Sequence, residues 1–544
     1  MGFDALYILE LTLVIIASLP CDHETYILPV LMVTSEGSEL GEHIEMQDLF
    51  LVNSRDGQNH HKLDTYHTIS LIINRIIGTG IFSTPALIFT LCQQSIGISI
   101  VLWMLGGIFT FAGLSVYLEF GLKIPKSGGE KNYLSRTLPT PKHLIECVYA
   151  FTIVLLGFSS GNSYAFGKYI IYVLGLNSQL SDSIIDKLSR YIGSAVVISC
   201  TLWHIYFPTG AKKSILYLGF VKVLILASIV LLGLVAIIAP SVIEPHWDNF
   251  ENSFSHGSQS IDWYSISVAL LQVIYSFKGW ENANYVLEEL EDPHKTLMIA
   301  APVSVGLTTF LYIAIVISYY IVIPKDEISN TGILISGVFF EKNFEKYSKS
   351  LAAQIVSRFL PFCITLSNYG NVMAVSFSNA RVNQELAKEG IFPFTHIFSK
   401  LNYALFLHCF VTILVLIIPP NGNVYQLIID LYAYPSGWFN LIIGVGLVYM
   451  HWTNNDNWND IPTPWTSWYV LTGIFIVSNL FLAVVPFVPP NGSVENDGYA
   501  YWVFPVSGIA VMAVGAVYWY FFVKKNYSEY TVALNSEDYE VYNE

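Results

Sequence analysis

Long apolar runs dominate the sequence and limit what the chain can fold into. About twelve of them are long enough to cross the roughly 30 Å hydrocarbon layer of a bilayer as α-helices. Helices pair their main-chain polar groups internally, as lipid requires of a spanning segment. We therefore predict an all-α integral membrane protein with about 12 transmembrane helices. Their approximate limits are 67–92, 97–122, 143–174, 191–207, 214–239, 264–288, 298–323, 351–379, 403–419, 424–451, 466–488 and 500–523.

Composition agrees with a membrane protein and argues against several other classes. Only 12% of the residues are charged and the mean hydropathy is +0.51, whereas about a quarter of a soluble domain is charged. The net charge of -15, with no basic patch, argues against nucleic-acid binding. The spans lack paired carboxylates, a histidine-rich set and a nucleophile with its base, so we expect no enzyme and no cofactor. No two of the six cysteines have CxxC spacing, so we expect no metal site.

Three regions are expected along the chain. They are a partly disordered N-terminal region at 1–65, a transmembrane domain at 66–523 and a short tail at 524–544. The apolar stretch at 5–18 is too short to span, and is either an interfacial helix or the product of a wrongly assigned gene start. Twelve spans place the N-terminus and the C-terminus on the same side of the membrane. Lysine and arginine are about twice as frequent in the loops on that side as in the loops on the other side, which predicts that both termini are cytosolic.

The first span contains "RIIGTGIFSTP", residues 75–85. The two glycines and the proline weaken a helix, and irregular backbone at membrane depth survives only where protein or a water-filled cavity covers it. One interpretation is close helix packing through the glycines. The other is a half-helix whose N-terminal amides attract an anion such as a carboxylate.

The sixth span contains a second interruption, in "VIYSFKGWENANYVLEELEDPHKT" at 273–296. Charged residues inside a membrane are costly and indicate function. Interruptions at corresponding positions of two repeats indicate a transporter's binding site, which favours the second interpretation of the first span. Lys278 is expected to pair with Glu281 one helical turn later, to narrow the site, or to alter its preference for charge.

Four motifs carry a family resemblance: "IIGTGIFSTP", "SGGEKNYL", "FKGWENANYVLEELEDPHKTL" and "SFSNARVNQELAKEGIFPF". In this order they resemble the amino acid–polyamine–organocation superfamily, in its L-type amino-acid-transporter branch, and most closely the fungal methionine permeases. The resemblance runs from about residue 66 to residue 523. It implies a LeuT-like fold of two inverted five-helix repeats plus two C-terminal helices, with helices 1 and 6 unwound. It also implies a multi-pass protein of the plasma membrane.

The resemblance further implies where an amino acid would bind. The main chain of the first break would receive the carboxylate, and carbonyls of the sixth span would receive the ammonium. Tyr275 falls where the family places an aromatic gate, and Trp280 follows the glycine of the second break. The implied substrate-binding residues are Ile77, Gly78, Thr79, Gly80, Ile81, Tyr275, Ser276, Phe277, Gly279 and Trp280.

Other polar residues in the spans have two interpretations each. Lys222 is a candidate proton carrier, which the resemblance supports, or a lysine that fixes two helices by hydrogen-bonding freed carbonyls of the first span. Arg75 and Glu119 are candidates for an inner gate or for structural pairing. A possible side-chain pocket, or alternatively a packing surface, is formed by Ser160, Gly161 and Asn162, with Lys278 as a further pocket candidate.

These features together predict a secondary active permease. It would import methionine, or another neutral amino acid, with protons, by rocking one helix bundle against another in the lipid bilayer. The sequence has no P-loop, which argues against ATP-driven transport. Three alternatives stay open: a non-transporting amino acid sensor of the same fold, an exchanger, and a transporter of another amino compound.

Overall fold

The computed structural model describes residues 62–524, except for 158, 177–178, 256–262, 345–350, 392–393, 419–423 and 490–500. Three predicted features lie outside the described residues: the N-terminal region up to residue 61, its apolar stretch at 5–18, and the tail from 525. Within the described residues the secondary structure is helical, apart from one isolated bridge between Leu63 and Leu290.

Helices follow one another along the described chain with short connections. Their bounds are α3 (Thr65–Ile76), α4 (Thr79–Ser83), α5 (Pro85–Leu91), α6 (Ile96–Lys123), α7 (Glu130–Thr137), α8 (Leu144–Leu156), α9 (Ser160–Val173), α10 (Asp182–Tyr206), α11 (Pro208–Ile238), η1 (Trp247–Phe250), α12 (Trp263–Phe277), η2 (Trp280–Glu289), α13 (Pro293–Val322), α14 (Lys325–Ile328), η3 (Gly332–Leu334), α15 (Ile335–Phe344), α16 (Leu351–Lys388), α17 (Thr395–Phe398), α18 (Leu401–Ile417), α19 (Val424–Thr453), η5 (Asn455–Asp460), α20 (Tyr469–Val484), η6 (Val485–Phe487), α21 (Val503–Tyr518) and η7 (Trp519–Val523).

Each predicted span falls on a helix or on a broken helix. By length and composition, six helices of the described chain are long and apolar enough to cross a membrane, or seven if a bent pair counts as one span. That bent pair is Thr65–Ser83 with Pro85–Leu91, which meet at 54°. The structure therefore has the all-helical, multi-pass character that the apolar runs predict.

Local sequence explains where several helices begin. Asp64 caps α3, with its side-chain oxygen 2.8 Å from the amide nitrogen of His67. Asp292 caps α13 in the same way, and Pro293 occupies the first helical position, where no amide hydrogen is needed. Pro208 opens α11 for the same reason. Short polar side chains and proline thus fix the start of these helices.

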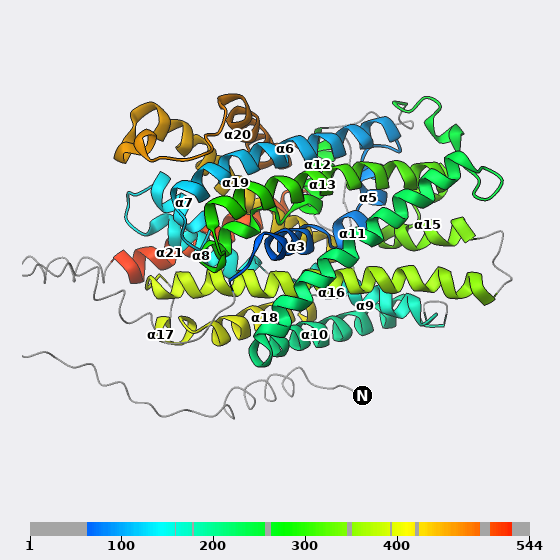
Figure 1. Ribbon diagram of the computed structural model, residues 1–544, viewed down its shortest axis with the longest axis horizontal. Helices are drawn as coiled ribbons and strands as arrows, with labels where there is room; N and C mark the ends of the chain where they lie inside the picture. The colour runs from blue at the N-terminus through cyan, green and yellow to red at the C-terminus, as the bar shows by residue number, and fades with distance from the viewer. Residues whose placement is uncertain are drawn as a thin grey trace, which may run out of the picture. The chain divides into compact units, whose positions relative to one another are not determined.

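The helix α3 lies inside the bundle, in contact with α11, α13 and α16 (Figure 1). Its residues from Ser70 to Ile76 are buried, including the polar Asn74 and Arg75. By contrast, α11 presents large apolar side chains such as Phe220 and Leu231 on its outer surface. Polar groups inside and apolar groups outside are the arrangement that a bilayer requires.

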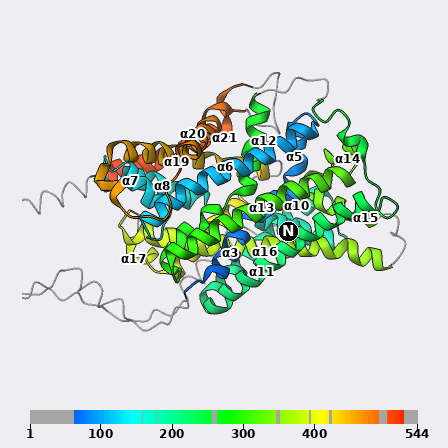
Figure 2. The same cartoon turned by 45° about the horizontal axis from the view of Figure 1, so that its top comes forward.

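The two ends of the bundle carry different elements. Both views place α7 and α17 at one end, on the left, and α5 and α15 toward the other (Figures 1 and 2). We call the first of these the α7 end. There the chain before α3 pairs with the chain after η2: the Leu63 amide donates to the Glu289 carbonyl at 2.7 Å, and the Glu291 amide donates to the Leu63 carbonyl at 3.0 Å.

One predicted span is confirmed in extent, at Leu144–Val173, but consists of two helices, and another is longer than predicted. The predicted span at 143–174 is divided between α8 and α9, with Gly157 as the C-cap of α8, and the Asn379 side chain donates to the Gly157 carbonyl. The predicted span at 351–379 continues as α16 to Lys388. Its last turns pack inside the α7 end, where Arg381 pairs with Glu289, so the helix need not stop at the membrane boundary.

Candidate functional site

The first helix break lies at Ile77 and Gly78. Ile77 is extended (φ -76°, ψ 105°) and Gly78 has φ -148° and ψ -142°, so α3 stops at Ile76 and α4 starts at Thr79. A Cβ added to Gly78 would lie 2.2 Å from Asn162 Oδ1 and 2.8 Å from Asn371 Nδ2. The glycine therefore allows close approach of polar side chains from α9 and α16. The packing and site interpretations of this motif are compatible.

A helix that ends inside a protein leaves its last carbonyls without helical partners. Here Lys222 of α11 supplies two of the missing donors. Its Nζ donates to the Asn74 carbonyl at 2.8 Å and also to the Ile77 carbonyl. Lys222 is fully buried. These contacts are those expected if Lys222 fixes α11 to the first break, and its role as a proton carrier stays a prediction.

Two residues that the sequence did not single out supply the remaining donors. Asn371 Nδ2 of α16 donates to the Arg75 carbonyl at 2.6 Å. The Tyr312 hydroxyl of α13 lies 3.1 Å from the Ile76 carbonyl and 3.1 Å from the Ser276 carbonyl. Tyr312 thus stands between the main chains of the first and sixth spans. The ends of both broken helices are held by side chains from the surrounding helices.

The start of α4 faces α9 and α12. The Thr79 amide donates to Asn162 Oδ1 at 2.7 Å, and Thr79 Oγ1 lies 3.0 Å from the Tyr275 hydroxyl. Ser160 is also buried at the start of α9, next to Gly161. The structure therefore brings together Thr79, Tyr275 and Asn162, which the sequence analysis placed in one site. The Asn162 side chain thus satisfies the first free amide of α4.

The second break lies at Lys278 and Gly279, between α12 and the 3-10 helix η2. Gly279 has φ +124°, a backbone angle that residues other than glycine rarely adopt. A Cβ added to Gly279 would lie 2.4 Å from Arg75 Cγ. Between α4 and α12, the other halves of the two broken helices, a Cβ on Gly80 would lie 2.5 Å from Ser276 Cα. Both breaks therefore touch each other through glycine. They face one another at these two contacts.

Charged side chains follow the second break. Lys278 Nζ lies 2.9 Å from Glu281 Oε1, which is the ion pair expected from their spacing. Lys278 also donates to Ser436 Oγ of α19 at 3.3 Å, and the Gly279 amide donates to Glu281 Oε2 at 3.0 Å. The Trp280 ring packs edge-on against α6, with its centroid 4.7 Å from that of Tyr117. The charge of Lys278 is therefore balanced within its own helix turn.

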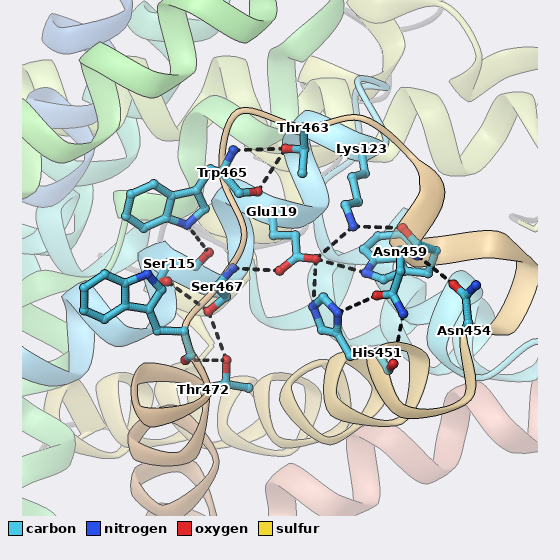
Figure 3. Close-up of polar contacts among 12 residues, drawn as sticks. Ser115, Glu119, Lys123, His451, Asn454, Asn459, Thr463, Trp465, Ser467 and Thr472 are labelled. Atoms are coloured by element: carbon cyan, nitrogen blue, oxygen red, sulfur yellow. Dashed lines mark hydrogen bonds and ion pairs between the residues drawn. The ribbon is translucent and has the colours of Figure 1, made fainter.

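Arg75 and Glu119, the two gate candidates, have different surroundings. Glu119 is fully buried on α6. It lies 3.1 Å from Lys123 Nζ and 2.9 Å from His451 Nε2 (Figure 3). It also accepts hydrogen bonds from the Ser467 amide at 2.8 Å and from Trp458 Nε1 at 3.0 Å.

Lys123 lies one turn after Glu119 on α6, and the other partners come from α19 and from the segment that joins α19 to α20. Arg75, by contrast, touches Gly279 and lines a cavity beside the second break. The partners of Glu119 are more than 300 positions away in sequence, except for Lys123, and no local pattern could have indicated them.

Apolar helices around two facing helix breaks are typical of a membrane transporter. The family model for amino acid permeases matches residues 63–528. The chain belongs to that family, and it is therefore a multi-pass membrane permease and not an enzyme.

Individual relatives agree with this assignment. The chain is 34% identical to the high-affinity methionine permease of Saccharomyces cerevisiae over 469 residues, which is 85% of this chain and 79% of that protein. It is 28% identical to the low-affinity methionine permease of the same yeast, over 86% of this chain and 83% of the relative. The human large neutral amino acids transporter small subunit 2 is 25% identical, over 82% of this chain and 79% of the relative. The expected branch is thus confirmed.

Proposed function

We propose that this permease imports a neutral amino acid, with methionine as the first candidate, together with protons. The carrying observation is the pair of facing helix breaks at Gly78 and Gly279. A free amino acid needs donors for its carboxylate and acceptors for its ammonium a few ångströms apart. The amides at the start of α4 and the carbonyls at the end of α12 are suited to these two tasks.

The substrate carboxylate would bind the Thr79 amide by replacing the side chain that now accepts its hydrogen bond. In the present structure the Thr79 amide is satisfied by Asn162 Oδ1 at 2.7 Å. An amino acid carboxylate is a stronger, charged acceptor and would displace the Asn162 side chain. The neighbouring amides of Gly78, Gly80 and Ile81 belong to the same proposed cradle. Ser160 and Gly161, which precede Asn162 in the first turn of α9, would border the substrate side chain.

The ammonium would bind at the end of α12, near Tyr275, Ser276 and Phe277. The Ser276 carbonyl already accepts a hydrogen bond from Tyr312 at 3.1 Å, and the Tyr275 carbonyl accepts one from the Lys278 amide at 3.1 Å. A carbonyl oxygen has a second lone pair, so each can still accept from a substrate. Tyr275 would close over the substrate through its contact with Thr79.

Proton coupling would act through Lys222. Its Nζ holds carbonyls on both sides of the α3 terminus, at Asn74 and Ile77. A protonated lysine offers three donors and a neutral one offers two, so loss of the proton weakens the contact between α11 and the first break. The gain or loss of one proton would thereby favour one arrangement of α3 over the other.

Twelve spans would form two inverted five-helix repeats and two further helices, with the breaks in the first helix of each repeat. The α7 end would face the cytosol, with both chain termini, and the protein would lie in the plasma membrane. Transport would proceed by alternating access, with the bundle that holds α3 and η2 rocking against the remaining helices.

The test is uptake by purified protein in liposomes with an imposed proton gradient. We expect accumulation of labelled methionine above the external concentration, and loss of that accumulation when a protonophore collapses the gradient. Uptake of no amino acid from a broad panel would refute the transport proposal and favour a sensor. Accumulation that is indifferent to the gradient but requires internal amino acid would favour an exchanger.

The proton role has its own variant. Lys222→Met should abolish accumulation against a gradient while leaving amino acid binding measurable. The matched control is Lys213→Met, which removes a lysine exposed on the surface of the same helix. Undiminished uphill uptake by Lys222→Met would exclude the proposed role.

A further inference from the structure

A small cavity lies beside the second break, and no residue of the proposed amino acid cradle lines it. Its walls include Arg75 of α3, Lys278 of the second break and Glu130 of α7. Ser436, Phe439 and Asn440 of α19 contribute another wall, and Tyr149, Thr152, Ile153 and Leu156 of α8 a further one. Residues from Gly78 to Ile81 and from Tyr275 to Phe277 are not part of the lining. The cavity is therefore distinct from the proposed cradle, although it adjoins both breaks.

The charges at this cavity come from three separate elements. Glu130 is buried, and its two oxygens accept hydrogen bonds from the Tyr285 hydroxyl at 3.0 Å and the Tyr149 hydroxyl at 3.2 Å. Burial raises the pKa of the Glu130 carboxyl, although the nearby Lys278 opposes that rise. A cation arriving beside Glu130 would relieve the cost of burying its charge.

Three charged residues line the cavity: Arg75 and Lys278 are positive and Glu130 is negative. Glu281, which pairs with Lys278 but does not line the cavity, brings the formal sum of the four groups to zero. A lone anion entering the cavity would meet Glu130, and a lone cation would meet Arg75 and Lys278. A molecule that carries one charge of each sign would find a complementary group for both. Ile153, Leu156 and Phe439 offer an apolar surface to the rest of such a molecule.

One polar group of the lining is also left without a partner in the described structure. Asn379 Oδ1 is buried and accepts no hydrogen bond from the residues described, although Asn379 Nδ2 donates to the Gly157 carbonyl. A buried amide oxygen without a donor is costly, and a ligand ammonium would supply that donor. Asn379 and Glu130 are thus two acceptors at one cavity.

From this juxtaposition we propose that the cavity is a second amino acid subsite, for a zwitterion with an uncharged side chain, on the α7 side of the helix breaks. Arg75 and Lys278 receive the carboxylate there, and Glu130 and Asn379 receive the ammonium. The subsite rests on the proposed function in one respect: it lies on the path by which substrate would leave the cradle toward the cytosol. Its occupancy is independent of proton coupling.

The experiment is equilibrium binding of labelled L-methionine to the purified full-length protein in detergent, with stoichiometry as the readout. We expect two molecules per wild-type chain. Gly78→Val should reduce this to one, because the added side chain enters space held by Asn162 and Asn371. Glu130→Gln should also reduce it to one, and the double variant should bind none.

Two further variants separate the subsite from folding and from general loss of charge. Thr152→Leu fills the cavity from α8 without touching a charged group, and should also bind one molecule. The matched control is Glu327→Gln, which removes a carboxylate from an ion pair with Lys342 elsewhere in the chain, and should bind two.

One molecule per wild-type chain, with none bound by Gly78→Val, would overturn the subsite. Two molecules bound by both Glu130→Gln and Thr152→Leu would overturn it as well. Uptake in liposomes keeps the two proposals distinguishable. If wild-type protein transports methionine but binds a single molecule, which Gly78→Val loses, only the subsite fails. If it binds two molecules but transports none, only the transport proposal fails.

Discussion

Replacement of Glu119 by glutamine should destabilise the protein strongly, although the two side chains have the same shape. Glu119 is fully buried, and the Lys123 side chain, 3.1 Å away, is only 2% exposed. Glutamine keeps an acceptor for the Ser467 amide or for Trp458, but it leaves the Lys123 ammonium buried without a countercharge. Removal of one partner of a buried ion pair costs about 3–5 kcal/mol. We take the lower figure, because Lys123 also donates to the Trp458 carbonyl at 2.9 Å.

A cost of about 3 kcal/mol shifts an unfolding equilibrium roughly a hundredfold. The assay is reversible unfolding in mixed micelles, followed by tryptophan fluorescence, which Trp458 and Trp465 beside Glu119 should report (Figure 3). The control is the double variant Glu119→Gln with Lys123→Met, which removes both charges and should recover much of the loss. A loss below about 1 kcal/mol in the single variant, or a double variant less stable than the single, would contradict this reasoning.

Two further predictions concern the main chain at the breaks and the start of α3. Gly279→Ala should lower both the transport rate and the thermal stability, since Gly279 has φ +124° and a Cβ would lie 2.8 Å from the Arg75 carbonyl carbon. Gly332→Ala is the control for backbone strain alone, because Gly332 has φ +53° and no atom within 4 Å of an added Cβ. Equal effects of the two substitutions would argue against the contact with Arg75. Asp64→Ala should cost up to about 1 kcal/mol as a lost cap. Partial burial would raise the pKa of Asp64, but hydrogen bonds from His67 outweigh it and lower the pKa below 3.8. The difference in stability between wild type and Asp64→Ala should therefore hold above about pH 4 and shrink as pH falls further, and a difference that grows in acid would be inconsistent with this assignment.

The sequence was informative wherever the determinant was local. Glycine and proline at Gly78, Gly80 and Pro85 indicated the first break, and Gly279 beside Lys278 indicated the second. The pairing of Lys278 with Glu281 followed from a separation of three positions, which places two side chains on one face of a helical turn. Helix propensity and spacing act over a few residues, and such signals are readable in a single chain.

Groups that complete the site were not predictable in this way. Tyr312 and Asn371 look like ordinary residues of apolar helices, and their importance comes from carbonyls more than 200 positions earlier in the chain. Glu130 lies in a motif that indicated the family, but its position at a cavity depends on how α7 packs against α8 and η2. Only the packing of distant helices determines which polar side chain meets which freed main-chain group.

Hydrogen bonds at Leu63 have a mechanical consequence for any motion of the bundle. The segment before α3 exchanges two main-chain hydrogen bonds with Glu289 and Glu291, and the far end of α3 rests on Gly279 through Arg75. The helices α3 and η2 are therefore in contact with each other at both ends. Turning α3 alone would break both bonds at Leu63, at about 1 kcal/mol or more each. Rotation of the two helices as one body would break neither bond. Joint rotation of α3 and η2 therefore costs less free energy than rotation of α3 alone.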